Sequence, residues 1–344
     1  MGGKKKSKKN QKSKIIFTIL TVIILIAVSS WYLYGKPQIV ISPEGISFEK
    51  PSEEQAEEAE RPVQTEQASQ TVQTCSNSSL DEGHAENSPL YFGNPSDSFQ
   101  ALESELNYLM EKAQFTLSYN TSTLNPNWVA WHLSASDLGV ADRADTFRPD
   151  PDLPSQWYAV RKQDYKFPAY GFDRGHICPS ADRTASTEDN SMTFLMTNMV
   201  PQAPDNNRIV WVALEKFERE YVQKGKEAYI FAGPLGVGGR GDKGYFEKIP
   251  VTLKDGSELE ITVPAFTWKI ILFLPEGQDD LSRINSQTEV LAVCVPNEQG
   301  CGKKGSWQQY LCSINYIEEN TGYDFFELLP DELEEEIESR VMTW

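Results

Sequence analysis

The sequence predicts an α+β fold. Six segments have the β-branched and aromatic composition of strands, whereas only one long segment has a clear helical period. The two types do not alternate regularly, as they would around a parallel sheet. The predicted strands lie at residues 116–119, 128–133, 228–232, 249–253, 265–274 and 289–295.

The dominant helix is predicted to begin near Asp205 and to end at Gly225. Large apolar residues recur every three or four positions from Trp211 to Tyr221, which is the period of a helix with one buried face. Polar residues at its start are candidates for the N-cap, and a glycine is a common stop signal.

The first 35 residues predict a membrane anchor. Residues 1–14 form a basic tail with seven lysines and no acidic residue, and residues 15–35 are uncharged and long enough to span a bilayer. The lysines predict a cytoplasmic N-terminus, so we expect a single-pass membrane protein with an extracytoplasmic body. The alternative is a signal peptide cleaved near Ala27 and Ser29, which would leave a secreted protein.

Three further segments follow the predicted transmembrane helix. Residues 36–88 are rich in Glu, Gln, Ser, Thr and Pro and predict a disordered spacer, in which the apolar piece at 38–48 is the candidate for ordered structure. Residues 89–330 have the composition of a folded domain. Residues 331–344 predict an acidic helix or tail with a solvated face.

The charge of the chain is unusual for a protein that binds nucleic acid. The formal net charge is −18, and the seven lysines of the tail leave −25 for the rest. Phosphate binding normally uses a basic patch. Surface charges are screened beyond roughly 8–10 Å at physiological salt, and much of the acid lies outside residues 89–330. The composition therefore does not exclude a nucleic-acid substrate.

Five cysteines give an odd count for an exported chain. Cys75 lies in the spacer and Cys178 near the motif described next. A disulfide is plausible among the other three, Cys294, Cys301 and Cys312. A zinc site is the alternative, but no two cysteines are separated by two residues, which disfavours it.

Of the three histidines, His176 has the context most typical of catalysis. His84 lies in the spacer, and His132 lies in an alternating segment and is interpreted as a strand residue. His176 closes the tetrapeptide 173–176, DRGH, in which a glycine permits a tight backbone. By itself this tetrapeptide fits a structural salt-bridge cluster as well as a catalytic site.

The helix thirty residues later favours the catalytic interpretation. Asn207, Trp211, Glu215 and Arg219 follow a four-residue step and are expected to share one slowly drifting face. Packing alone does not readily account for an amide, a carboxylate and a guanidinium above an apolar stripe.

These motifs resemble the signature of the DNA/RNA non-specific endonucleases, the family of endonuclease G and the Serratia nuclease. The resemblance rests on residues 173–176 (DRGH), residues 197–202 (TNMVPQ) and the helix positions Asn207, Trp211 and Glu215. Segments at 147–154, 231–234, 263–266 and 321–326 are similar in the expected order, so the resemblance covers roughly residues 115–330. It implies a ββα-metal nuclease fold with a central antiparallel sheet and flanking helices.

The resemblance also implies a metal-dependent hydrolysis of DNA and RNA backbones. His176 would be the general base that activates water, and Asn207 would hold Mg²⁺, with Mn²⁺ possible in its place. The choice of Asn207 over Asn206 rests on register, since the metal ligand in the family precedes the helix tryptophan by four residues and the glutamate by eight. Mg²⁺ keeps several waters, so one amide oxygen and the substrate phosphate suffice.

Four further residues receive roles in the same way. Glu215 would orient water at the metal, Arg174 and Arg219 would neutralise charge on the scissile phosphate, and Asn198 would support the site by hydrogen bonds. Recognition would go through the phosphate backbone, because no segment resembles a module that reads bases. A homodimer is expected from relatives.

Two departures from the family pattern and two other interpretations stay open. Cys178, which replaces a small apolar residue, is interpreted as inert and buried, with binding of inhibitory soft metals as the alternative, and Val200 replaces a frequent serine. The chain could also be a catalytically silent nucleic-acid-binding domain or a surface interaction domain. The filled catalytic positions disfavour the silent domain, and the acidic charge is the only support for the surface interaction domain.

Overall fold

The computed structural model describes residues 38–42, 45–49, 85–304 and 306–342, which fall into two units. In the unit Met1–Asn77, strands β1 (Gln38–Ser42) and β2 (Gly45–Glu49) pair antiparallel. This pair coincides with the apolar piece at 38–48, which was the candidate for ordered structure within the predicted spacer. Residues 50–84 of the predicted spacer lie outside the described residues.

The predicted membrane anchor has no support in the part of the chain that the structure describes. Residues 15–35, on which it was placed, lie outside the described residues, and no helix among those described is long and apolar enough to cross a bilayer. Helix α5 (Val212–Val222) has 11 residues, whereas a span needs about 20. The prediction of a single-pass membrane protein is corrected accordingly.

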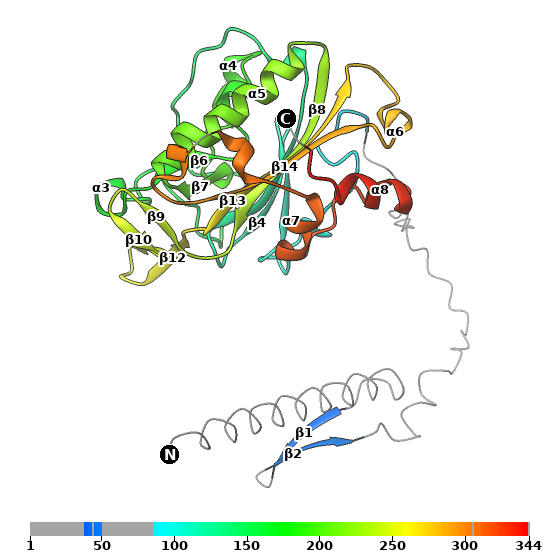
Figure 1. The fold of residues 1–344 in the computed structure, drawn as a ribbon. Helices are drawn as coiled ribbons and strands as arrows, with labels where there is room; N and C mark the ends of the chain where they lie inside the picture. Colours follow the sequence, from blue (N-terminus) through cyan, green and yellow to red (C-terminus); the bar gives the residue numbers. More distant parts are fainter. Residues whose placement is uncertain (1–37, 43–44, 50–84, 305, 343–344) are drawn as a thin grey trace, which may run out of the picture. The chain divides into compact units, whose positions relative to one another are not determined.

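A seven-stranded antiparallel sheet forms the centre of the unit Ser78–Trp344 (Figure 1). The strand order is β15-β14-β13-β8-β5-β4-β3. The strands are β3 (Tyr108–Glu111), β4 (Thr116–Asn120), β5 (Asn125–Leu133), β8 (Lys226–Leu235), β13 (Phe266–Pro275), β14 (Glu289–Pro296) and β15 (Leu311–Cys312). All six predicted strands are confirmed, five of them in this sheet and the sixth in β11 (Lys248–Thr252), which pairs with β12 (Glu258–Thr262).

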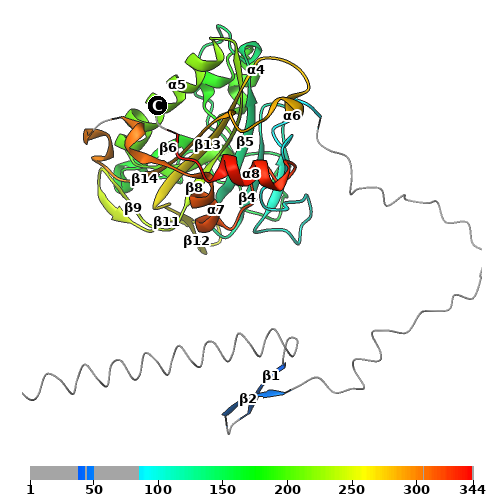
Figure 2. The ribbon, with the colours of Figure 1, turned by 45° about the vertical axis from the view of Figure 1, so that its right-hand side comes forward.

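The two faces of the sheet bury separate hydrophobic cores. Alternate residues of a strand point to opposite faces, so Trp131 of β5 packs in one core with Leu214 of α5. Trp128, three residues earlier on the same strand, points to the opposite face. It packs in the other core with Ile317 of α7 (Ile314–Thr321) and Ile337 of α8 (Asp331–Glu338). Figure 2 shows α7 and α8 over this second face. The acidic C-terminal segment is therefore not only a solvated face, because its Ile337 is fully buried.

A smaller ββα arrangement projects from the first face. Strands β6 (Asp173–His176) and β7 (Met199–Gln202) pair antiparallel, and the π-helix η4 (Asn206–Trp211) then continues into α5. The predicted helix from Asp205 to Gly225 is thus confirmed, with a wider first turn. A third core, which includes Phe172 and Met199, packs β6 and β7 against β11 and β12.

Short elements connect these parts. They are α3 (Phe167–Tyr170), α4 (Thr187–Met192), α6 (Asp280–Arg283), β9 (Gly239–Gly241), β10 (Gly244–Phe246) and the 3-10 turns η1 (Ala135–Asp137), η2 (Ser180–Asp182), η3 (Met196–Asn198), η5 (Cys301–Lys304) and η6 (Trp307–Tyr310).

The expected disulfide is wrong, since all four described cysteines carry free thiols. Cys294 and Cys312 lie beside the second core, whereas Cys301 packs against the first, so the sheet separates Cys301 from the other two. Burial raises the pKa of Cys294 to about 11 and that of Cys312 to about 12. Of the described residues, none of these cysteines belongs to a group that could hold a metal.

Candidate active site

Strands β6 and β7 place His176 at the start of the ββα arrangement. His176 pairs with Met199, and Gly175 pairs with Val200. A Cβ atom on Gly175 would lie 2.0 Å from the side-chain oxygen of Gln202, so only glycine allows the two strands this approach. The glycine of the tetrapeptide is therefore required by packing next to the histidine.

The His176 ring is buried in an aromatic setting. Its centroid lies 4.7 Å from that of Phe194 and 5.5 Å from that of Phe147, both edge-on. The buried Nε2 has no hydrogen-bond partner among the described residues. Burial, together with the positive charges of Arg143 and Arg174, lowers the pKa of His176 to about 3. The ring is therefore neutral at neutral pH, which is the form that accepts a proton.

Asn198 holds the backbone that follows His176. Its Nδ2 donates to the carbonyl oxygens of Cys178 at 2.8 Å and of Thr193 at 2.9 Å, and its Oδ1 accepts from the Cys178 amide at 2.9 Å. The side chain is fully buried, so these bonds are protected from water. Asn198 fixes the path of the chain two residues after the histidine.

The two asparagines at the start of η4 are used differently. The buried Asn206 accepts from Gln202 Nε2 at 2.5 Å and donates to Thr267 Oγ1 at 3.1 Å and to the Pro296 carbonyl at 2.9 Å. Both the oxygen and the nitrogen of the Asn206 amide thus already have hydrogen-bond partners. Asn207 is half-buried, and no described residue donates to its Oδ1.

Asp173 sets the orientation of the Asn207 amide. Its Oδ2 accepts from Asn207 Nδ2 at 3.0 Å, and Arg208 Nε and Nη2 donate to the same carboxylate at 2.8 and 2.6 Å. An ionised carboxylate only accepts hydrogen bonds, so the amide nitrogen must face Asp173 and the oxygen must face away. Sequence reasoning gave Asp173 no role of its own, although the residue lies inside the motif.

Glu215 and Arg219 lie on α5 above a buried polar network. Arg219 donates to Asp182 at 2.7 Å, and its Nη1 lies 4.0 Å from Glu215 Oε2. Asp182 also accepts from the indole of Trp131 at 3.0 Å. Burial raises the pKa of Glu215 to about 7, against the opposing effect of the positive charges of Lys269 and Arg219.

The predicted polar face of the helix is interrupted by Trp211. This side chain is fully buried, and the ammonium group of Lys269 lies 5.0 Å from its ring. Lys269 also forms a fully buried ion pair with Glu218 at 2.9 Å. The π-helical turn wraps more residues per turn than an α-helix, so the four-residue step does not keep Asn207, Trp211 and Glu215 in one exposed row.

A third arginine joins the site from a segment that sequence reasoning left unassigned. The charge of Arg143 lowers the pKa values of both His176 and Glu215, so it lies within electrostatic reach of both. Its guanidinium lies 4.9 Å from the ring of Phe194 and donates to Ser180 Oγ at 2.8 Å. No local motif identified Arg143, because its segment has neither helical nor strand period.

Cys178 lies beside the site but not in it. Its side chain is fully buried in the first core, and burial raises the pKa of its thiol. The thiolate, which is the form that binds metals and reacts, is therefore disfavoured.

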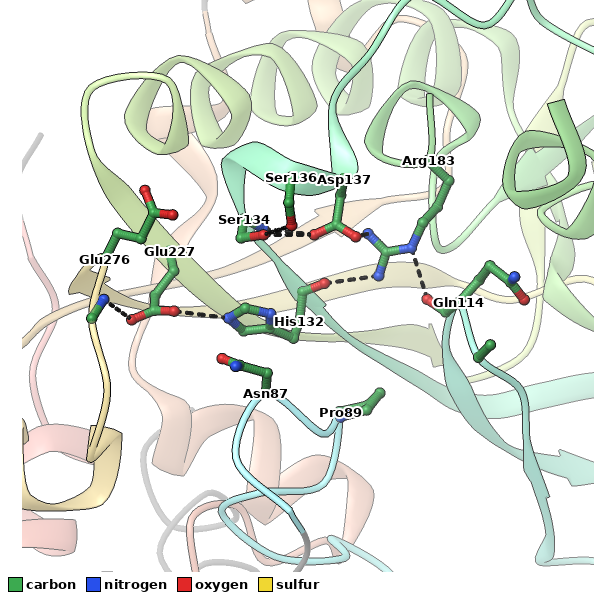
Figure 3. Close-up of a pocket in the computed structure, with 12 residues that line it drawn as sticks. Asn87, Pro89, Gln114, His132, Ser134, Ser136, Asp137, Arg183, Glu227 and Glu276 are labelled. Carbon is green, nitrogen blue, oxygen red and sulfur yellow. Dashed lines mark hydrogen bonds and ion pairs between the residues drawn. The ribbon is translucent and has the colours of Figure 1, made fainter. Parts of the chain in front are cut away.

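A second cluster of ligand-type residues has a structural explanation. His132, Glu227 and Asp280 bring ligand atoms within 4.8 Å of one another, and of the described residues they alone form such a group. Arg283 binds both carboxylates and supplies the positive charge that a cation would bring. Arg183 lines the neighbouring cavity of about 360 Å³ and donates to three backbone carbonyls, two of which, those of Gln114 and His132, are drawn in Figure 3. His176 does not line this cavity.

Comparisons with known proteins identify relatives over the same part of the chain. Residues 93–332 match the model of the DNA/RNA non-specific endonuclease family. A nuclease from Nostoc sp. (strain PCC 7120 / SAG 25.82 / UTEX 2576) is 45% identical over 252 residues, which cover 73% of this chain and 85% of the relative. Nuclease C1 of Cunninghamella echinulata var. echinulata is 30% identical over 70% of this chain and 88% of its own length.

A mitochondrial relative and a solved structure are also similar to this chain. The mitochondrial nuclease EXOG of Danio rerio is 32% identical over 62% of this chain, and the match spans 59% of that relative. The crystal structure of an EndoG/EndoGI complex is similar with a TM-score of 0.54 and 21% identity, over 71% of this chain and 92% of that chain. At this identity the structural match supports the fold alone.

Proposed function

Because the chain belongs to the DNA/RNA non-specific endonuclease family and is therefore an endonuclease, we propose that it hydrolyses DNA and RNA backbones in a metal-dependent reaction without reading base sequence. We assign this activity to residues 89–330 and to the ββα-metal site at β6, β7, η4 and α5. Two observations support it best: His176 is buried and neutral, and the amide oxygen of Asn207 accepts from no donor among the described residues.

His176 is proposed as the general base. Its pKa of about 3 in the free protein keeps the ring unprotonated, but such a weak base would take a proton from water poorly. A bound phosphate adds negative charge near the ring and offsets the effect of Arg143 and Arg174, so substrate binding itself raises the basicity of His176. Phe147 and Phe194 hold the ring in place during the proton transfer.

Asn207 is proposed as the protein ligand of Mg²⁺, with Mn²⁺ as a possible substitute. The fit rests on the Asn207 oxygen, which Asp173 orients and which accepts no hydrogen bond from a described residue. An amide oxygen is a hard ligand of the kind that Mg²⁺ prefers. When bound, the ion would polarise the phosphate and stabilise the leaving oxygen. The occupied amide of Asn206 supports the choice between the two asparagines.

The other site residues are proposed to position water and phosphate. Glu215 in its ionised form would accept hydrogen bonds from water, and the charges of Lys269 and Arg219 favour that form. Arg174 and Arg143 would offer forked donors to phosphate oxygens. Arg219 has one donor committed to Asp182 and would act through its remaining N–H groups. Asn198 keeps the backbone after His176 in place.

A digestion assay on the full chain tests this proposal. Plasmid DNA and RNA are incubated with the protein in Mg²⁺ or Mn²⁺, with and without chelator, beside His176→Ala, Asn207→Ala and the control His84→Ala, which lies outside the family match. We expect digestion of both substrates by the parent and the control, none with chelator, and a loss of about 10²–10⁴-fold for His176→Ala. Intact substrates in every lane would instead favour the catalytically silent or surface interaction domain.

A further inference from the structure

A second cation shares an aromatic ring with Arg174. The guanidinium carbon of Arg174 lies 4.5 Å from the ring centroid of Phe147, and the Lys162 ammonium nitrogen lies 5.7 Å from the same centroid. The Arg174 guanidinium also donates to the Lys162 carbonyl at 3.4 Å. Phe147 also packs edge-on against His176, so the ring that carries both positive charges contacts the proposed general base.

Neither of these cations has a carboxylate partner among the described residues. Neighbouring cations do have one, since Arg161 pairs with Asp164 at 3.1 Å and Arg208 pairs with Asp173 at 2.6 Å. Two like charges on one ring repel each other, and in an otherwise acidic chain carboxylates are abundant. Two uncompensated cations beside a candidate catalytic group are a feature typical of an anion-binding site.

We propose that Lys162 binds a backbone phosphate next to the scissile one, and so holds the substrate strand without taking part in bond breaking. This inference rests on the proposed nuclease function. Lys162 and Arg174 are separated by no more than the sum of their distances to the Phe147 centroid, which suits successive phosphates of one strand. Lys162 is exposed, and a flexible ammonium group binds phosphate as a point charge without fixed geometry. The contact therefore serves DNA and RNA alike.

The test measures how salt weakens binding of a nucleic acid. Full-length His176→Ala protein, in which cleavage is expected to be slowed, is titrated into a labelled single-stranded DNA at several NaCl concentrations, and fluorescence anisotropy gives Kd. The same measurement is made with Lys162→Gln and Lys162→Arg added. The matched control is Lys224→Gln, because the Lys224 ammonium lies 5.6 Å from the Tyr221 ring in a similar arrangement, at the other end of α5 from Asn207.

Loss of one phosphate contact should reduce the slope of log Kd against log salt by about 0.7 on single-stranded DNA, or about fivefold in Kd at 0.1 M salt. We expect this change for Lys162→Gln and not for Lys162→Arg or Lys224→Gln. With His176 intact, Lys162→Gln should raise KM and leave kcat within about twofold. If Lys162→Gln has the same salt slope as Lys224→Gln, the proposed phosphate contact of Lys162 is overturned, even if the parent digests DNA. A parent that binds with the expected slope but never cuts would overturn the proposed activity and leave the contact standing.

Discussion

Replacement of Asp173 by asparagine should raise the Mg²⁺ concentration that cleavage needs and change the stability of the protein only slightly. The Asp173 carboxylate accepts one hydrogen bond from Asn207 and two from Arg208. An asparagine at position 173 can offer either its oxygen or its nitrogen, so it no longer forces the Asn207 oxygen to face away. In part of the molecules the Asn207 amide would then present its nitrogen, which cannot bind a cation.

The size of the effect follows from the bond that is lost. A hydrogen bond to a charged group contributes about 1.5–3 kcal/mol, and each 1.4 kcal/mol corresponds to about tenfold. Loss of a residue that orients a metal ligand costs about 10–100-fold in metal affinity in other sites. We therefore expect the Mg²⁺ concentration for half-maximal cleavage to rise about 10–100-fold. The ion pair with Arg208 is largely exposed and contributes about 0–1 kcal/mol to stability.

The assay is a Mg²⁺ titration of plasmid cleavage by the parent, Asp173→Asn and Asp242→Asn. Asp242 is an exposed carboxylate whose charge reaches Arg208, and it makes no described side-chain bond to Asn207, so it controls for loss of one negative charge nearby. Activity of Asp173→Asn should return at high Mg²⁺, and its thermal unfolding should stay close to that of the parent. The reasoning is refuted if Asp173→Asn and Asp242→Asn share the half-maximal Mg²⁺ concentration of the parent.

Three further perturbations test the environment of the site and the C-terminal helix. Lys269→Met should lower the free energy of unfolding in urea by about 1–3 kcal/mol, because it leaves the fully buried Glu218 carboxyl group, whose pKa burial already raises to about 8, without its hydrogen-bond partner; the double variant Lys269→Met, Glu218→Leu should recover most of that loss, and equal loss in both would contradict the pairing argument. Cys178→Ala should keep its nuclease activity within about twofold, and thiol alkylation of the native parent should not inactivate it, since the thiol is fully buried with a raised pKa; rapid inactivation that Cys178→Ala abolishes would argue for a reactive thiol. Burial, together with the negative charges of Glu318, Glu334 and Asp324, raises the pKa of Glu338 to about 9. The stability that its protonated form contributes is fully present below the unfolded pKa near 4.5 and is lost as pH rises through 9. Glu338→Gln should therefore flatten the decline of the free energy of unfolding between pH 6 and 9, measured in urea; an unchanged decline would assign that decline to other groups.

The site motifs were accessible from the sequence because they are local. His176, Asn198 and Asn207 were identified from short segments, and the structure brings β6, β7 and η4 together as one arrangement. Arg143 was missed because only the tertiary structure carries its irregular segment to His176 and Glu215. The role of Asp173 was missed for a different reason. It orients the Asn207 amide through one hydrogen bond, and the sequence does not tell which of the two amide atoms faces Asp173.

Other errors arose from the same limit. The spacing of Cys294, Cys301 and Cys312 suggested a disulfide, but the sheet places Cys301 against a different core from the other two. The acidic composition of residues 331–344 suggested a solvated face, but one apolar side chain, Ile337, anchors α8 in the second core. Composition averages over a segment, whereas burial is decided residue by residue.

The sequence by itself determined the α+β class, the six predicted strands, the dominant helix and the family, because periodicity and contiguous motifs are properties of neighbouring residues. The tertiary structure alone decided the electrostatics of the site. The low pKa of His176, the raised pKa of Glu215 and the buried pair of Lys269 and Glu218 depend on burial and on charges that lie far apart along the chain. Desolvation and Coulomb interactions act through space, so a linear sequence does not contain them until the sheet and the ββα arrangement bring these groups together.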